Sequence, residues 1–437
     1  MNPRGPAGAD RLILLMAAYA VAWFVFMRMP NDIVRSPIAG TDLSSYYTAG
    51  YLVRTGDAAS LYDTAPGDTI LGDATSGRWR QAGDELGIAR QHYYIYPPFF
   101  ALLAAPLSLL PFPAARLVWL GADLLLLGLF VRLYLVWRRA DGTSPSPLEL
   151  ALIAVTLGLE FLPLIWALAI GQTSLLILAL LAGAILCVKR RHEAAAGALL
   201  GVATAIKLTP ALLLAYFLVR GRPRVALWGL ATSVFCTLSA ALALGPAATL
   251  RFFTVAVPAM SGGTAYFLNQ SLTGFFDRLV TSGDVTQVAL STSRLTKGLA
   301  TAGSLCLAAF TYHCLRRRPG RPDGLDLDLE VSAVMLLTLV LSPISWTHHY
   351  LVILIPLYTI TAAAVRAGRP APWLAVSVGV AFLLIARKPH HELFAEGYAR
   401  LCLSAALYGA LILWGACLLL HARRADPEPG RAFANAG

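Results

Sequence analysis

The stretch Gly40-Thr-Asp-Leu-Ser-Ser-Tyr-Tyr-Thr-Ala-Gly-Tyr-Leu52 follows the first apolar segment of the chain and places one carboxylate, Asp42, just beyond it. Apolar and aromatic residues, including Tyr46 and Tyr47, recur through this stretch at helical spacing. The spacing predicts a short amphipathic helix along a membrane interface, with its tyrosines at headgroup level. Asp42 then lies in or just before the first turn. It can act there as a general base, or it can cap the helix, as Thr41 also can.

Composition identifies the class of protein. Of the 437 residues, 57% are hydrophobic and 14% are charged, against roughly a quarter charged in a soluble domain. The chain is therefore expected to be an all-α, polytopic membrane protein. The net charge of +11 lies in short arginine clusters between apolar segments, which is typical of membrane topology and does not call for nucleic acid as a partner.

Apolar segments long enough to cross a bilayer predict about ten full spans. They are residues 11–29, 114–137, 148–168, 171–188, 225–245, 295–315, 331–347, 349–366, 372–386 and 398–421. The first segment is expected to stay uncleaved, because its apolar run continues past a possible signal-peptide site. Two further apolar stretches, 96–113 and 193–219, are short and broken by proline, which predicts re-entrant or hairpin helices.

The predicted organisation is a single membrane domain, residues 1–424, followed by a disordered tail at 425–437. Two larger loops, about 30–96 and 246–293, interrupt it, and the section 72–90 of the first loop shows no clear period. If every basic cluster is cytoplasmic, the two broken stretches must each return to the side from which they entered. Asp42 and the other polar span junctions then face the extracytoplasmic side of the membrane.

Lys207 is one of four lysines and the only one inside an apolar stretch. Ionisable groups at membrane depth are costly and often mark functional sites. Its flexible ammonium group suits a lipid phosphate, although it can also extend to the interface without any function.

His348 and His349 follow the segment Ser342-Pro-Ile-Ser-Trp346 at the end of a span. On a helix, adjacent side chains diverge by about 100°, and no acidic partner lies nearby, so a metal site is not expected. The six cysteines show no metal-binding spacing and are expected to be packing residues. An imidazole that donates to a phosphate or a sugar is one interpretation, and a structural histidine is the other.

Three amides lie at other span junctions. Gln172 occupies a tight turn, where it can bind a sugar hydroxyl or cap the turn. Asn269 and Gln270 lie in the second large loop. Asn269-Gln-Ser271 matches a glycosylation acceptor, but amides beside a pocket can equally bind hydroxyls. The segment His390-His391-Glu392 is expected to be a solvated loop.

Seven short motifs together carry a resemblance to a known family. They are Gly40-Thr-Asp-Leu-Ser-Ser-Tyr-Tyr47, Leu61-Tyr62-Asp63, Tyr96-Pro97-Pro98-Phe99, Gly171-Gln172-Thr173, Lys207-Leu-Thr-Pro210, Asn269-Gln270-Ser271 and Ser342-Pro-Ile-Ser-Trp346-Thr-His348-His349. In this order, over about residues 11–366, the chain resembles glycosyltransferase family 87. The resemblance implies a GT-C fold, an extracytoplasmic active site, a sugar carried on polyprenyl monophosphate, and Asp42 as the catalytic base.

The expected function is transfer of a hexose, with mannose the first choice, from the polyprenyl-phosphate donor to a hydroxyl of a lipid or glycan acceptor, with inversion. We expect Lys207, His348 and His349 to bind the phosphate. The side chains expected to bind the sugar or acceptor are Tyr46, Tyr47, Gln172, Asn269, Gln270 and Trp346. No cofactor or metal is expected, because a monophosphate leaving group does not require one. The alternatives are a transporter or flippase of lipid-linked sugars and a ligase that uses a pyrophosphate-linked glycan.

Overall fold

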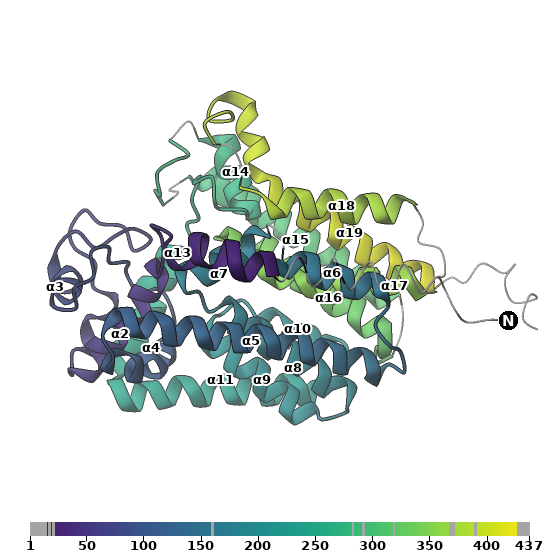
Figure 1. Cartoon of the computed structure of the whole chain (residues 1–437), viewed down its shortest axis with the longest axis horizontal. Helices are drawn as coiled ribbons and strands as arrows, with labels where there is room; N and C mark the ends of the chain where they lie inside the picture. The colour runs from purple at the N-terminus through teal and green to yellow at the C-terminus, as the bar shows by residue number, and fades with distance from the viewer. Residues whose placement is uncertain are drawn as a thin grey trace, which may run out of the picture.

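Helices account for the regular structure of the chain. Figure 1 shows the computed structural model, in which the long helices run side by side along the longest axis. The structure describes residues 15, 19, 22–158, 161–281, 284–290, 293–317, 320–366, 372–388 and 391–425. Within these ranges there is no β-strand, only an isolated bridge between Asp73 and His92. The all-α expectation is confirmed. Residues 11–14, 16–18, 20 and 21 of the first predicted span, residues 426–437 of the predicted tail and His390 lie outside the described residues.

The elements alternate between long apolar helices and short helices in the loops. The first group is η1 (Phe24–Val34), α2 (Thr41–Arg54), η2 (Ala58–Tyr62), α3 (Gly77–Glu85), α4 (Pro98–Ala104), η3 (Ala105–Leu109), α5 (Phe112–Ala140), α6 (Pro147–Gly158), α7 (Leu162–Ile170), α8 (Ser174–Lys189) and α9 (Glu193–Ile206). The second group is α10 (Ala211–Val219), α11 (Pro223–Leu244), α12 (Pro246–Arg251), η4 (Phe252–Ala256), α13 (Val257–Met260), α14 (Leu272–Val280), α15 (Arg294–Arg316), α16 (Gly324–Leu341), η5 (Thr347–Ile353), α17 (Leu354–Arg366), α18 (Pro372–Ala386), η6 (Gly397–Ser404) and α19 (Ala405–Ala425).

Several of these helices are suited to crossing a membrane. Among the described residues, 5 helices are long and apolar enough: α5, α11, α15, the continuous helix of η5 and α17, and that of η6 and α19. The pair α6 and α7, bent by 45°, would be a sixth if it is one broken span. Four shorter apolar segments accompany them: α4 with η3, α8, α9 and α18. The structure thus supports a polytopic helical membrane protein, while the count of about ten full spans stays a prediction.

The two proline-broken stretches form short helices, as predicted. The segment 98–109 contains α4 and η3, and the segment 193–219 contains α9 and α10 with a break between Ile206 and Ala211. Glycines let α9 lie directly against α11. A Cβ on Gly197 would lie 2.7 Å from the Cβ of Trp228, and one on Gly201 would lie 2.6 Å from the Cβ of Thr232. Close backbone approach through small residues is a common way to pack membrane helices.

The helix α2 forms as predicted, but its environment differs from the prediction. Nine of its 14 residues are buried, Tyr46 and Tyr47 among them. It packs on α4 and η3, where a Cβ on Gly50 would lie 2.6 Å from a main-chain oxygen. The residues after it also cover it, since Ser45 donates to the main-chain oxygen of Tyr93 at 2.9 Å. The tyrosines are therefore packed inside the protein and not exposed to lipid headgroups as predicted, while the place of this helix along the membrane interface stays a prediction.

Two loop regions are more ordered than the sequence suggested. The section 72–90 contains α3, whose Trp79 is buried and donates to the main-chain oxygen of Ser60 at 2.9 Å. The second loop contains α12, η4, α13 and α14. The helix α16 begins at Gly324 instead of at the predicted residue 331, because basic partners accompany the buried acids of its first turns. Asp328 is one of these acids, and Lys189 lies 2.8 Å from it.

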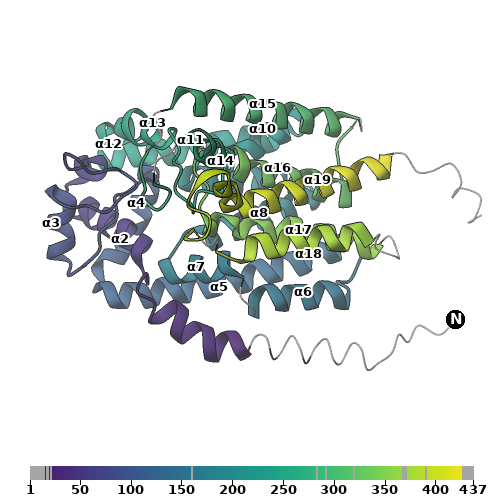
Figure 2. The same cartoon turned by 90° about the horizontal axis from the view of Figure 1, so that it is seen from above.

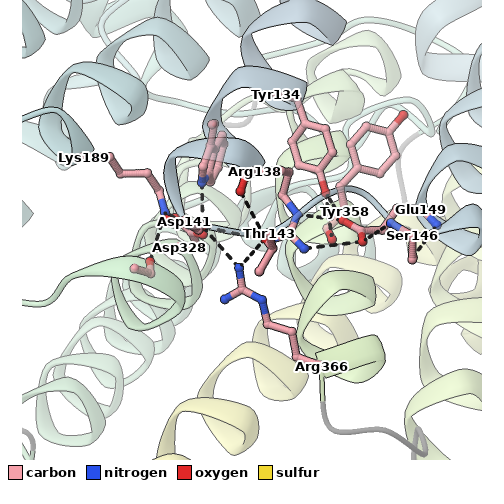
Figure 3. A network of polar contacts seen from close by, with 12 residues as sticks. Tyr134, Arg138, Asp141, Thr143, Ser146, Glu149, Lys189, Asp328, Tyr358 and Arg366 are labelled. Atoms are coloured by element: carbon pink, nitrogen blue, oxygen red, sulfur yellow. Dashed lines mark hydrogen bonds and ion pairs between the residues drawn. The ribbon is translucent and has the colours of Figure 1, made fainter. Parts of the chain in front are cut away.

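A network of buried charges closes the end of the bundle opposite Asp42 (Figure 3). Lys189 Nζ lies 2.7 Å from Asp141 Oδ1, and Arg138 Nε lies 2.7 Å from Glu149 Oε1. These side chains join the ends of α5 and α8 to α6 and α16. Buried charges are tolerated when they are paired in this way. We call this the basic end, because Lys189, Arg138 and Arg366 belong to basic clusters of the sequence, and we call the opposite end, which holds α2, α3 and α4 (Figures 1 and 2), the Asp42 end.

Candidate active site

Asp42 lies in the first turn of α2, which is tied to the end of α7. Gly40 precedes the helix with φ of +75°, and its N–H donates to the main-chain oxygen of Ala169 at 2.7 Å. No side chain caps this helix start, and the Thr41 hydroxyl donates to an earlier carbonyl at 3.0 Å. The carboxylate of Asp42 instead accepts a hydrogen bond from the amide of Gln172. The capping interpretation is therefore wrong, and the carboxylate is held by a residue far away in the sequence.

The turn between α7 and α8 brings Gln172 to Asp42. Gly171 has φ of +74°, and a Cβ there would lie 2.8 Å from a side-chain carbon of α2, so only glycine lets the turn lie this close. The Gln172 Oε1 accepts a hydrogen bond from the Tyr96 hydroxyl at 3.0 Å. That hydroxyl accepts one from the Tyr46 hydroxyl, also at 3.0 Å. A continuous polar chain therefore runs from Tyr46 through Tyr96 and Gln172 to the carboxylate.

Lys207 reaches the same group from the break after α9. Its backbone is extended, with φ of −149° and ψ of 126°, because Pro210 and the turn before it interrupt the helix. Its Nζ lies 5.7 Å from the centre of the Tyr96 ring, which is within the range of a cation–π contact. The ammonium group therefore points into the protein, beside the tyrosine that binds Gln172.

The two histidines lie in η5 with their rings in contact. Their ring centres are 4.5 Å apart and the planes are at 87°. The Nδ1 of His349 accepts the main-chain N–H of Trp346 at 3.2 Å, which assigns the proton of the neutral ring to Nε2. His348 is buried, and its Nε2 has no hydrogen-bond partner among the described residues.

A small pocket lies between α8, α10, α16 and η5, at the break that carries Lys207. Its volume is about 40 Å³, and its polar lining consists of Ser174, Lys207, Thr209, Thr338, Ser345 and His349. The hydroxyls of Ser345 and Thr338 already donate to main-chain oxygens at 2.6 Å. The ammonium group of Lys207, the imidazole N–H of His349 and the hydroxyls of Ser174 and Thr209 are the donors that the pocket offers, and no acidic group lines it. Such a set of donors suits a phosphate oxygen. Of the two histidines, His349 is the one that lines this pocket.

Four of the other predicted ligands have different contacts. The Tyr47 hydroxyl donates to the main-chain oxygen of Leu110 at 2.7 Å, away from Asp42. Asn269 accepts the main-chain N–H of Ser345 at 2.9 Å, and Gln270 donates to a main-chain oxygen of η6 at 2.7 Å. The side-chain amides of Asn269 and Gln270 are thus already hydrogen-bonded to main-chain groups. Trp346 is half-buried and packs edge-on against Tyr266 at 5.8 Å.

Sequence reasoning missed Tyr96, Arg90 and His92. Tyr96 was part of a motif, but nothing in the sequence indicated that its hydroxyl meets Gln172. His92 Nε2 lies 3.3 Å from Asp73 Oδ1. The side chain of Gln91, between the two basic residues, accepts a hydrogen bond of 2.9 Å from the hydroxyl of Thr48 on α2. A basic residue on each side of a buried glutamine is too weak a pattern to have been recognised.

The surroundings of Asp42 change its acidity. Burial raises the pKa of its carboxyl group above the usual value. The nearby basic groups of His92, Lys207 and Arg90 and the hydrogen bond from Gln172 oppose this effect without cancelling it. A carboxylate with a raised pKa is a stronger base than one on the surface. The site therefore holds a carboxylate fit for proton abstraction beside a cationic pocket.

Metal binding finds no support in the arrangement of side chains. In the parts of the chain that the structure describes, no three His, Cys, Asp or Glu side chains form a group that could hold a metal ion. Whether the reaction needs a metal is a separate matter, and metal independence stays a prediction.

Comparison with known proteins identifies the family. The profile described as glycosyltransferase family 87 matches residues 94–343, a range that contains Gln172 and Lys207 and leaves out Asp42 and His349. A Mycobacterium tuberculosis protein named polyprenol-phosphate-mannose-dependent alpha-(1-2)-phosphatidylinositol mannoside mannosyltransferase is 34% identical over 271 residues, which are 59% of this chain and 59% of that protein. The chain thus matches about three fifths of the length of that relative.

A second relative matches over a longer range. The Mycolicibacterium smegmatis protein named polyprenol-phosphate-mannose-dependent alpha-(1-2)-phosphatidylinositol pentamannoside mannosyltransferase is 32% identical over 312 residues, 68% of this chain and 69% of that protein. No solved structure matches the chain.

Proposed function

Because the chain belongs to glycosyltransferase family 87, we propose that it transfers mannose from polyprenyl monophosphate to a hydroxyl of a lipid or glycan acceptor. The names of the two mycobacterial relatives state a polyprenol-phosphate-mannose donor and phosphatidylinositol mannoside acceptors. The proposal includes a GT-C fold in the bacterial inner membrane. It places the site on the extracytoplasmic side, which is supported by the clustering of basic residues at the opposite end.

One observation carries the proposal. The Asp42 carboxylate is joined through Gln172 to Tyr96, and Lys207 lies over the ring of that tyrosine while also lining the pocket of His349. A base and a cluster of phosphate-binding donors are thus neighbours. Glycosyl transfer from a lipid phosphate needs both, one for the attacking hydroxyl and one for the leaving group.

Asp42 acts as the general base in this mechanism. The acceptor oxygen attacks the anomeric carbon of the donor, and its proton passes to the Asp42 carboxylate as the new C–O bond forms. The bond from the anomeric carbon to the phosphate oxygen breaks, and the lipid monophosphate leaves with the electron pair. Attack from the face opposite the phosphate inverts the anomeric configuration, as in inverting glycosidases.

Lys207 and His349 stabilise the leaving group. Negative charge grows on the bridging oxygen as the sugar departs, and an ammonium group and an Nε2–H donor that are already in place lower the barrier. His348 orients the ring of His349 by edge-to-face contact. We assign Gln172, Tyr46 and Trp346 to the walls of the sugar and acceptor site. Asn269, Gln270 and Tyr47 support the surrounding loops, as their main-chain contacts indicate.

The experiment is transfer of radiolabelled mannose from polyprenyl-phosphate mannose to a bacterial lipid extract by the purified protein in lipid. Asp42→Asn keeps the shape of the side chain and its contact with Gln172, but removes the base. We expect transfer to fall by about 10²- to 10⁴-fold, the usual contribution of a general base, with donor binding kept. Asp84→Asn is the control, because Asp84 is an exposed carboxylate of α3 in the same loop.

The outcomes separate the competing functions. Equal transfer by wild type and Asp42→Asn would remove Asp42 from the chemistry. Absence of transfer by the wild type, with polyprenyl phosphate still bound, would mean that mannose is the wrong sugar or would favour a carrier of lipid-linked sugars. Transfer only from a pyrophosphate-linked donor would instead indicate a ligase.

A further inference from the structure

A second hollow lies on the other side of the Lys207 break. It runs between α4, α9, α11 and η4 and has a water-accessible volume of about 260 Å³. We call it the α4–α11 groove and define it by six of its lining residues: Pro97, Phe99, Leu208, Val234, Leu238 and Phe253. The helices α4, α9 and α11 contact one another, and α11 runs along the outside of the bundle in Figure 1.

The groove has an almost wholly apolar surface. Its hydroxyl groups belong to Thr204, Ser233 and Thr237, and each of them donates to a main-chain oxygen at 2.8 to 2.9 Å. No hydroxyl of the groove is therefore left to donate to a polar ligand. Its outer residues are open, since Val234 is 47% exposed and Phe253 is 49% exposed. In a membrane these residues face lipid, so an apolar chain can enter from the side.

The α4–α11 groove lies next to the pocket of Lys207 and His349. Its lining residues Ala205 and Leu208 flank Lys207, and Pro97 directly follows Tyr96, whose ring lies under the Lys207 ammonium group. The pocket of Lys207 and His349 offers about 40 Å³, which is space for a few water molecules or phosphate oxygens and not for a lipid chain. A lipid whose phosphate binds at Lys207 must therefore lay its chain elsewhere, and the α4–α11 groove is the adjoining apolar space.

We propose that the α4–α11 groove binds the first isoprenoid units of the polyprenyl-phosphate donor, so that α4 and α11 select the donor lipid. This inference rests on the proposed function for the identity of the lipid. The groove offers no free donor group, and most of its lining is apolar, so it recognises the chain by shape and apolar contact. Donors with too few isoprenoid units to fill it therefore bind more weakly than long ones.

The first arm of the test narrows the groove. Val234→Trp places a large side chain in it, and Leu230→Trp is the matched control, since Leu230 lies one turn earlier on α11, is 58% exposed and does not line the groove. We expect Val234→Trp to raise the KM for polyprenyl-phosphate mannose on the order of tenfold. The KM for the lipid acceptor stays at the wild-type value, and the preference for long over short donor chains shrinks. A raised KM for the acceptor alone would assign the groove to the acceptor lipid and overturn the proposal.

The second arm does not depend on transfer. Polyprenyl phosphate with a diazirine in its first isoprenoid units is bound to the wild-type protein in lipid and photolysed, and the labelled peptides are identified by mass spectrometry. Label on residues 97–99, 204–208, 233–238 and 252–253 supports the proposal, and label confined to other helices overturns it. Label in the groove without any sugar transfer would uphold the groove while overturning the proposed function, so the two failures are distinguishable.

Discussion

The hydrogen bond from Gln172 to Asp42 makes a prediction about the pH dependence of transfer. The Gln172 amide donates to the carboxylate and thereby favours its ionised form. Replacing it in Gln172→Leu removes this donor and leaves the Tyr96 hydroxyl without its acceptor. A hydrogen bond to a charged group contributes about 1.5–3 kcal/mol, which corresponds to roughly one to two pKa units.

The sign of the effect follows from the ionised form that the bond stabilises. Loss of the donor raises the pKa of Asp42 further above its usual value, so the carboxylate takes up a proton at a higher pH. The acid limb of the kcat/KM profile therefore moves up by about one to two pH units, while activity at alkaline pH falls less. Gln172→Glu keeps the size of the side chain and adds a like charge, which raises the pKa of Asp42 further and moves the limb in the same direction.

The assay is kcat/KM for mannose transfer, measured across the pH range in which the wild type loses activity on acidification. Tyr96→Phe is the control, because it removes the hydroxyl that binds Gln172 and leaves the bond from Gln172 to Asp42. Its acid limb should move by a small fraction of the shift in Gln172→Leu. An acid limb of Gln172→Leu at the wild-type position, with the protein folded, would refute the assignment of Asp42 as the base held by Gln172.

Four further experiments test the site, the packing of α9 on α11 and the need for a metal. Lys207→Met removes the ammonium group beside the pocket and should lower kcat by roughly 10²-fold or more, which steady-state kinetics at saturating donor would show; an unchanged kcat would place the phosphate elsewhere. His92→Gln removes a basic side chain that lowers the pKa of Asp42, so the acid limb should again move to higher pH, and a shift to lower pH would contradict this reasoning. Gly201→Val inserts methyl groups where α9 meets α11 and should lower stability by about 1–3 kcal/mol, seen as a lower midpoint of thermal unfolding in detergent. EDTA should leave transfer unchanged, and loss of activity restored by a divalent ion would show that a metal takes part.

The sequence was sufficient for the parts of the fold that depend on local composition. Apolar length predicted helices such as α5 and α15 to within a few residues, and proline predicted the break at Lys207. The place of Asp42 in the first turn of a helix was also predicted, because helical spacing begins directly after it. These features follow from whether each segment prefers lipid or water and from what its own backbone allows.

The sequence was insufficient where the environment of a side chain comes from distant segments. Tyr46 and Tyr47 have the spacing of interfacial residues, yet the following loop and α4 cover them. Asn269 and Gln270 have the chemistry of sugar ligands, yet main-chain groups occupy their amides. A side chain's type states which bonds it can make, while the surrounding fold decides which of them are made.

The chain by itself determined that this is a helical membrane protein of glycosyltransferase family 87, with a carboxylate after its first apolar segment and a lysine in a broken one. Only the tertiary structure decided that Gln172 holds Asp42, that Tyr96 lies between them and Lys207, and that His349 lines the pocket while His348 is buried. Gln172, for example, is separated from Asp42 by 130 residues along the chain. Hydrophobicity and helix breaks are properties of each segment by itself. Hydrogen bonds and charge interactions between distant residues arise only when packing brings their segments within a few ångströms of each other.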